Sequence, residues 1–357
     1  MGAWAEARTD AARIQVSSGW PGPPAASTAA IVANAAHDHE RATEWALRAG
    51  VPVLVEKPMA PTVAAVERLL HLARAASGGL AVAHPFLFAR YLERFAALCQ
   101  GTTIEGINLQ WTDPVTETRH GESKQYDSSV PLYVDCLPHA SAILSMVVAG
   151  PQHCRGVTLR RGGALVVVDM TAGEVPCRVE IERNGPARRR TLEVATATGK
   201  YALDFSVEPG SIDTGAGLVD ADPEWQRGPR PVARLLSAFL AWSAGGAFDD
   251  RLNPAHALRA ARVGAEAAPA YEALLSQWLT ERLRSVERID ADLHYALAEV
   301  LQRHGRLPAS RLETLIGQAG NPFPGGSGSG LATSAEELRR WLAAAGTNLG
   351  DGSEVGR

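Results

Sequence analysis

The sequence predicts a two-domain α/β protein, in which a parallel-sheet domain is followed by an α+β domain with a mainly antiparallel sheet. Three observations favour this class. A strand–helix–strand pattern occupies 30–55, five strand-like segments with glycine turns occupy 154–207, and 357 residues exceed the usual size of one domain. The predicted domains are 1–102, 103–287 and 288–357, the last a helical appendage with a Gly/Ser linker.

The first domain opens with a short apolar strand at 30–33. The polar segment 34–39 then precedes a helix at 41–48, Gly50 ends that helix, and 51–55 forms the next strand. A unit of this kind has parallel strands and a right-handed crossover. The pattern continues with an amphipathic helix at 62–76 and a strand at 80–83.

Polar residues follow both strands of this unit. In open parallel sheets, ligands bind beyond the carboxyl ends of the strands. A lysine at such a strand end is a functional candidate rather than a core residue. The candidates at this edge are Asn34, Ala35, His39, Glu56 and Lys57.

The segment 30–39, the helix after it and Val53-Leu54-Val55-Glu56-Lys57-Pro58 resemble the second half of the nucleotide domain in the Gfo/Idh/MocA (glucose–fructose oxidoreductase / inositol dehydrogenase) family. The resemblance implies an incomplete Rossmann-type domain with NAD or NADP as the cofactor. It also implies hydride transfer to or from a small hydroxyl- or carbonyl-bearing compound, sugar- or cyclitol-like. The residues it places at the cofactor are Asn34, Ala35, His39, Glu56, Lys57 and His84.

His84 follows the strand at 80–83, where the family has a polar and basic group. The arginines of this chain stand further along, at Arg90 and Arg94 on the following helix. Two interpretations of His84 are therefore open. It contacts the cofactor, or it is a hydrogen-bonded histidine at the edge of the cleft.

The Gly-rich turn that holds the pyrophosphate in this family is not found before Ala30. The segment contains Gly2, Gly19 and Gly22, and 20–24 is a turn rather than a phosphate cradle. By comparison with the family pattern, roughly fifty to seventy residues of a nucleotide domain are missing. Three explanations stay open: the true start lies upstream, another chain supplies the missing half, or the protein is a degenerate member that binds nucleotide weakly.

A second motif, Asp135-Cys136-Leu137-Pro138-His139, precedes an apolar helix predicted at 141–148. On a helix, Asp135 and His139 share one face. Pro138 leaves the carbonyl of Val134 without its helical donor, so the helix bends or begins there. The family carries Asp-x-x-x-His at this place, over the nicotinamide. Histidine titrates near neutral pH and can take the hydroxyl proton as the hydride leaves.

These residues define the predicted chemistry. Lys57 polarises the reacting oxygen, His139 donates or accepts the proton, and Asp135 orients the ring or holds a substrate hydroxyl. Packing of His139 against the helix is the competing interpretation. The polar segment before the motif adds the substrate candidates Lys124 and Tyr126, which a solvated loop explains equally well. The alternative function is a non-catalytic or degenerate family member that binds or regulates without a cofactor.

The second domain continues as successive strands with glycine turns between them. Their meander order indicates a largely antiparallel sheet, and the resemblance implies homo-oligomers through its open face. The expected strands are 104–111, 155–160, 165–170, 178–183, 189–195 and 201–207, followed by a loop at 209–230. Helices are expected at 231–244, 253–284, 290–304, 310–317 and 334–345.

Composition bounds the class of partner. A net charge of −4 gives no electrostatic case for nucleic acid or a membrane surface, and no apolar run reaches transmembrane length. The four cysteines lack paired metal spacing, so no metal is predicted. The expected protein is cytoplasmic, acts on a small molecule and associates with copies of itself. Substrate, reaction direction and the choice between NAD and NADP are not encoded in a recognisable motif.

Overall fold

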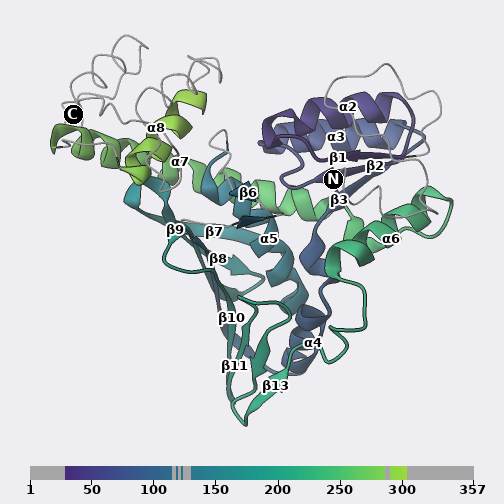
Figure 1. Ribbon diagram of the computed structural model, residues 1–357. Helices are drawn as coiled ribbons and strands as arrows, with labels where there is room; N and C mark the ends of the chain where they lie inside the picture. Colours follow the sequence, from purple (N-terminus) through teal and green to yellow (C-terminus); the bar gives the residue numbers. More distant parts are fainter. Residues whose placement is uncertain (1–28, 115–117, 120–121, 124–129, 286–289, 304–357) are drawn as a thin grey trace.

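The computed structural model describes residues 29–114, 118–119, 122–123, 130–285 and 290–303. Figure 1 shows a small sheet with helices over it beside a large sheet whose strands run away from it. The long helix α7 (Ala255–Ser285) crosses from the large sheet to the small domain. The predicted fold class, a Rossmann-type parallel sheet followed by a mainly antiparallel sheet, is confirmed.

The small sheet has parallel strands in the order β1-β2-β3. Its register pairs Ile31 with Leu54 and Leu54 with Ala81, so the predicted parallel strand–helix–strand unit is confirmed. The strands are β1 (Ala30–Val32), β2 (Val53–Glu56) and β3 (Leu80–Ala83).

Two helices connect these strands. α2 (His39–Arg48) begins directly after a 3₁₀ turn, slightly earlier than the predicted 41, and Gly50 follows its end with a φ of 75°. Glycine adopts this left-handed conformation without the clash that a Cβ would cause. α3 (Val63–Ala75) begins after Thr62, whose Oγ1 accepts a hydrogen bond from the amide of Ala65.

The middle strand of the small sheet, β2, is buried on both faces. On one face, Val53 and Val55 pack with α2, α3 and Ala257 of α7, so the long helix returns to the first domain. On the other face, Leu54 packs with Phe239 of α6 (Pro231–Ser243). Each such buried side chain contributes about 1.5–3 kcal/mol relative to exposure. The end of β2 that precedes Lys57 is therefore packed against helices on both faces of the sheet.

In the described part of the chain, the large sheet has the order β13-β12-β11-β10-β4-β9-β8-β7. β4 lies between β10, to which it is antiparallel, and β9, to which it is parallel. The predicted meander is right for β7-β8-β9 and β10-β11 and wrong between β9 and β10, because the first strand of the domain inserts there. The central strands are β4 (Ile104–Pro114), β7 (Gln152–Arg160), β8 (Leu165–Ala172), β9 (Val175–Gly185), β10 (Arg189–Thr196) and β11 (Gly199–Asp204).

Short strands supplement this sheet. β12 (Ser211–Asp213) and β13 (Leu218–Asp220) extend one edge, inside the segment that was predicted as a loop. Three residues give too few alternations for a strand pattern to be visible in the sequence. A separate hairpin pairs β5 (Thr118–Arg119) with β6 (Glu122–Ser123).

The two faces of the large sheet differ. One face packs under α5 (Leu132–Val147), α7 and α4 (Arg90–Cys99), which supplies Tyr91 and Phe95 to this core. The opposite face is polar, with ion pairs between Arg178 and Asp169 and between Lys200 and Glu193. Because α4 precedes residue 103 and packs in this core, the boundary at 102 stays a prediction.

α5 differs from its prediction at its start. It begins at Leu132, well before the expected 141, and Pro138 lies inside it. The proline is buried and the turn before it stays helical. Packing in the core therefore offsets the free-energy cost of the backbone hydrogen-bond donor that proline lacks. Asp135 and His139 are consequently both helical and one turn apart.

The chain's last described element is α8 (Ala291–Arg303). It docks on the second domain, where Arg161 pairs with Asp292 and the Tyr271 hydroxyl donates to buried Glu299. The helices predicted at 310–317 and 334–345 and the Gly/Ser linker lie outside the described residues. Within the described ranges, no helix combines the length and apolarity that crossing a bilayer needs.

Candidate active site

The central feature of the site is an ion pair between the two domains. Lys57 follows β2, and Asp135 lies in the first turn of α5. The Lys57 Nζ is 2.5 Å from Asp135 Oδ1 and also donates to the main-chain oxygen of Asp135 at 3.1 Å. The lysine side chain is 17% exposed and that of Asp135 is 46% exposed. An ammonium has three N–H donors, so two bonds to Asp135 leave one for a ligand oxygen.

The electrostatics keep Lys57 charged. Burial lowers the pKa of Lys57, but Asp135 and the neighbouring acidic groups raise it by more, and the net pKa lies above that of a free lysine. Burial raises the pKa of Glu56, although Lys57 opposes this, and a Glu56 oxygen accepts the amide of Lys57 at 3.3 Å. Lys57 is therefore a fixed cation at neutral pH rather than a proton acceptor. Such a cation can polarise a carbonyl or stabilise an alkoxide.

His139 lies one turn beyond Asp135, half-buried among aromatic rings. Its ring stacks on Trp111 of β4, with centroids 5.2 Å apart and planes inclined by 16°. Phe86 meets the same imidazole edge-on at 5.0 Å. The buried guanidinium of Arg190 also lies over the Trp111 ring, 3.7 Å from its centroid, and pairs with buried Asp113. Two aromatic rings therefore contact the imidazole, one stacked on it and one edge-on.

These aromatic and charged neighbours were not found by sequence analysis. Trp111 ends the strand predicted at 104–111, Phe86 follows the candidate His84 by two residues but had no predicted role, and Arg190 stands near no motif. A tryptophan on the buried face of a strand looks the same in a sequence whether it lines a site or fills a core. The role of Asp135 as a helper of His139 stays a prediction, while its contact in the structure is with Lys57.

The other predicted cofactor residues divide into two kinds. Asn34 and Ala35 are exposed at the carboxyl edge of the small sheet. His39 is buried, and its ring nitrogens lie 2.8 Å from the Pro58 carbonyl oxygen and 3.0 Å from that of Asn34. This ring therefore ties together the loops after β1 and β2. Lys124 and Tyr126 lie outside the described residues.

The contact of His84 with the cofactor stays a prediction. His84 follows β3 with 1% exposure, and among the described residues neither ring nitrogen has a hydrogen-bond partner, so the hydrogen-bonded alternative is not found there. Burial lowers the pKa of His84 to about 3, aided by His256, Lys57 and Arg259. The ring of His256 meets it edge-on at 5.9 Å. His84 is consequently neutral at physiological pH, with one donor and one acceptor.

The described part of this site offers neither a reactive cysteine thiol nor a group of metal ligands. Burial raises the pKa of the Cys136 thiol, beside Asp135, to about 12, so it stays protonated and a poor nucleophile. In the described ranges, His, Cys, Asp and Glu side chains form no group of three or more that could hold a metal ion.

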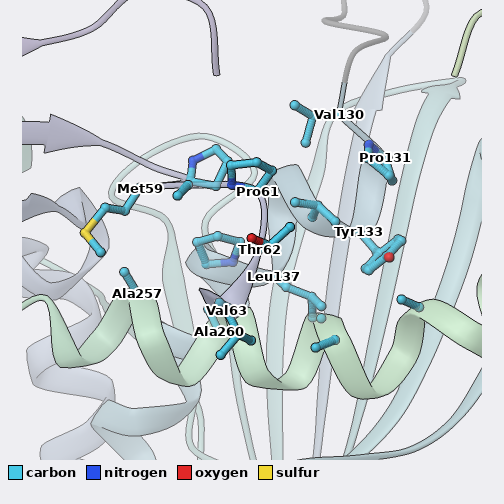
Figure 2. A pocket seen from close by; sticks show the side chains of 18 of the residues that line it. Met59, Pro61, Thr62, Val63, Val130, Pro131, Tyr133, Leu137, Ala257 and Ala260 are labelled. Carbon is cyan, nitrogen blue, oxygen red and sulfur yellow. The ribbon is translucent and has the colours of Figure 1, made fainter. Parts of the chain in front are cut away.

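A cavity of about 590 Å³ adjoins Lys57. It is enclosed by the segment after Lys57, the first half of α5 and the middle of α7 (Figure 2). His84 lines it, whereas Asp135 and His139 are not among its lining residues. Lys57 therefore stands at the border between this cavity and the His139 side of α5.

The parallel sheet with a charged carboxyl edge is Rossmann-like, and a large, mainly antiparallel sheet lies beside it. Residues 17–84 match the model of the oxidoreductase family with an NAD-binding Rossmann fold, Gfo/Idh/MocA. The predicted resemblance to this family is therefore confirmed for residues 17–84. Among curated proteins, none matches the chain.

Three solved structures illustrate the likeness in fold. UDP-N-acetylglucosamine 3-dehydrogenase GnnA from Acidithiobacillus ferrooxidans is 17% identical, with a TM-score of 0.56 over 70% of this chain and 79% of that one. KijD10, a 3-ketoreductase from Actinomadura kijaniata solved with TDP-benzene and NADP, is 18% identical, with a TM-score of 0.55 over 67% and 76%. GenD2 from gentamicin A biosynthesis, solved with NAD, is 17% identical, with a TM-score of 0.53 over 69% and 76%.

Proposed function

We propose that the protein is an NAD- or NADP-dependent oxidoreductase that transfers hydride to or from a small hydroxyl- or carbonyl-bearing compound. The observation that carries this proposal is the partly buried Lys57 cation, held by Asp135 one helical turn before His139. The family match supports it. A sugar- or cyclitol-like ring is the substrate class that the family and the activities named for two of the similar structures favour.

The roles follow from the geometry. Lys57 donates its remaining N–H to the reacting oxygen and stabilises the negative charge that develops there. Asp135 fixes the ammonium through two acceptors. His139, held between Trp111 and Phe86, takes the hydroxyl proton in oxidation or returns it in reduction.

The described residues fit one half of the cofactor. Asn34 and Ala35 are exposed beyond β1, and Lys57 supplies a cation beyond β2, which suits a nicotinamide at the carboxyl edge. When bound, NAD or NADP supplies or accepts the hydride. No Gly-rich cradle for the pyrophosphate is found in the sequence before Ala30.

The polar face of the large sheet is our proposed surface for association with a second copy. Alternating charges there, such as Arg178 with Asp169 and Lys200 with Glu193, permit a polar, charge-paired contact. Sedimentation of the wild-type protein and a double variant, Arg178→Glu with Lys200→Glu, would test it. A monomeric wild-type protein would contradict the proposal.

The function itself is tested by following NAD(P)H absorbance with a panel of sugars, cyclitols and their ketones. Turnover by the wild-type protein that Lys57→Met abolishes would support the assignment. The matched control is Arg48→Met, which removes an exposed cation from α2.

A further inference from the structure

His39 is a buried histidine whose two ring nitrogens both face main-chain carbonyl oxygens. It is the first residue of α2 and is 2% exposed. Nδ1 lies 2.8 Å from the oxygen of Pro58, and Nε2 lies 3.0 Å from that of Asn34. Both distances fall within the range of N–H···O hydrogen bonds, about 2.7–3.2 Å. Because a carbonyl oxygen accepts and cannot donate, each of the two nitrogens has to supply the proton.

The number of protons on the ring follows from these two acceptors. A neutral imidazole carries one N–H and one lone pair, whichever tautomer it adopts. In a neutral His39, one nitrogen would hold its lone pair against the lone pairs of a carbonyl oxygen, and two buried acceptors would lose their hydrogen bond. An imidazolium donates to both oxygens at once, and a charged donor makes the stronger bond. The two contacts therefore favour the charged ring.

The charges near His39 act in both directions. Burial disfavours a cation, and so does the dipole of α2 at its first turn. Asp38 and Glu40, which flank His39 in the sequence, oppose that dipole. Glu56 ends β2; burial raises the pKa of its carboxyl group, and positive charge on Lys57 and His39 opposes the rise. Acidic groups from α2 and from β2 thus offset part of the cost of a buried imidazolium.

The two hydrogen bonds join the loops at the carboxyl edge of the small sheet. Asn34 lies in the loop after β1, and Pro58 directly follows Lys57 in the loop after β2. The ammonium of Lys57 is 2.5 Å from Asp135 Oδ1, so a small shift of its loop would change this contact. We call the pair of bonds from His39 to Asn34 and Pro58 the His39 bridge. It fixes the spacing of the two loops only while both nitrogens donate.

We propose that His39 is an imidazolium, with a proton on each ring nitrogen, and that the His39 bridge positions Lys57 at the carboxyl edge of the sheet. His39 is in this role a positioning residue that acts through Lys57. The charge of the ring and the placement of Lys57 rest on the geometry of His39 alone. The effect of the bridge on turnover rests on the proposed function.

The charge of the ring is measured by ¹⁵N NMR of the full chain, labelled in its histidine rings, at pH 7. Free histidine, with a reference pKa of about 6.5, is mostly neutral at this pH. An imidazolium gives two nearly equal nitrogen shifts, whereas a neutral ring gives two widely separated ones. The His39 signals are assigned through the backbone of α2 and by their loss in His39→Gln. We expect two nearly equal shifts, and widely separated shifts overturn the proposal.

The placement of Lys57 is measured without turnover, by trace acetylation and mass spectrometry. The Lys57 ammonium is held by Asp135 in the wild-type protein and should react slowly. In His39→Gln, which is uncharged and donates from a single nitrogen, Lys57 should react on the order of tenfold faster, the equivalent of about one hydrogen bond. The chain unfolded in urea gives the upper limit of the rate. The matched control is His71→Gln, the same substitution at an exposed position of α3.

Equal reactivity of Lys57 in the wild-type protein and His39→Gln overturns its placement by the bridge. A variant rate that reaches the upper limit in urea shows a loss of the fold, and His39→Asn then takes the place of His39→Gln. The NMR measurement is made on the wild-type protein and decides the charge of the ring in either case.

Turnover decides the link to the proposed function. His39→Gln should lower kcat on the order of 10²-fold, the cost of misplacing a reacting group by about 1 Å, while KM changes less. An unchanged kcat together with faster acetylation of Lys57 would overturn the effect on turnover and leave the bridge established. Absence of hydride transfer by the wild-type protein on every compound would overturn the proposed function, whereas the NMR and acetylation results would still decide the His39 bridge.

Discussion

Replacing Lys57 by methionine separates the chemical role of this residue from its structural one. Methionine keeps most of the side-chain length and apolar contact but removes the ammonium. Asp135 then loses the donor that lies 2.5 Å from its Oδ1, while its carboxylate, 46% exposed, regains contact with water. No charge is left both buried and unpaired, which is the situation that makes breaking an ion pair costly.

The two expected magnitudes therefore differ. Removing a positioned charge donor at a reacting oxygen lowers the rate on the order of 10²–10³, which is about 2.7–4 kcal/mol of transition-state stabilisation. The free energy of unfolding should change by only about 1 kcal/mol or less, as for partly exposed pairs. A large loss of kcat/KM with a nearly constant unfolding free energy is thus the expected signature.

The assay pairs steady-state kinetics with urea denaturation of the same preparations. Arg48→Met is the matched control, because this arginine pairs with Glu44 at 2.6 Å on the exposed side of α2. We expect it to leave both quantities near their wild-type values. Retention of kcat/KM within about fivefold in Lys57→Met would refute the reasoning, since it would place Lys57 away from the reacting oxygen. A collapse of stability with the loss of rate would instead make the pair structural.

Four further outcomes are expected. His139→Ala should lower the rate and remove the limb of the kcat/KM–pH profile near neutrality, with circular dichroism unchanged; an unchanged profile would exclude His139 from proton transfer. Since the pKa of His84 is lowered to about 3, the unfolded state binds the extra proton below about pH 6.5, so the unfolding free energy should fall as pH falls from there towards 3, and His84→Phe should flatten that fall in acid denaturation series. Asp113→Ala should destabilise the protein by about 3–5 kcal/mol in urea denaturation, because it leaves the Arg190 guanidinium buried without its charge partner; a loss below about 1 kcal/mol would contradict this. NADH and NADPH should bind the 357-residue chain more weakly than micromolar in a fluorescence titration, because the sequence before Ala30 holds no Gly-rich phosphate loop, and sub-micromolar binding would refute that expectation.

Much of the small domain could be predicted because its signals are local. Gly50 marks the end of α2, Thr62 caps α3, and short β-branched runs alternate with amphipathic ones. The Asp135–Lys57 contact was harder to predict, because it joins residues 78 apart in the chain. Only the family resemblance placed both residues in one site. The cavity was invisible, because alanines spaced along a helix look the same whether they face a neighbouring helix or empty space.

The predicted order of the strands in the large sheet was wrong for a related reason. Alternation identifies a strand but does not say which strand lies beside it. The meander rule pairs neighbours in sequence, and it holds until β4 enters between β9 and β10. Burial favours the insertion. Leu109 and Trp111 are buried, and a central strand has a neighbouring strand on each side, which an edge strand lacks.

The inserted position of β4 also has a consequence for synthesis on the ribosome. Thr112 and Arg190, which are joined across β4 and β10, lie 78 residues apart in the chain. At 5–20 residues per second, roughly 4–16 s pass between the emergence of the first strand and that of its antiparallel partner. During that interval one edge of β4 has no partner and can pair with another nascent chain. Expression at lower temperature or with bound chaperone should therefore increase soluble yield more for this protein than for a simple meander of the same size.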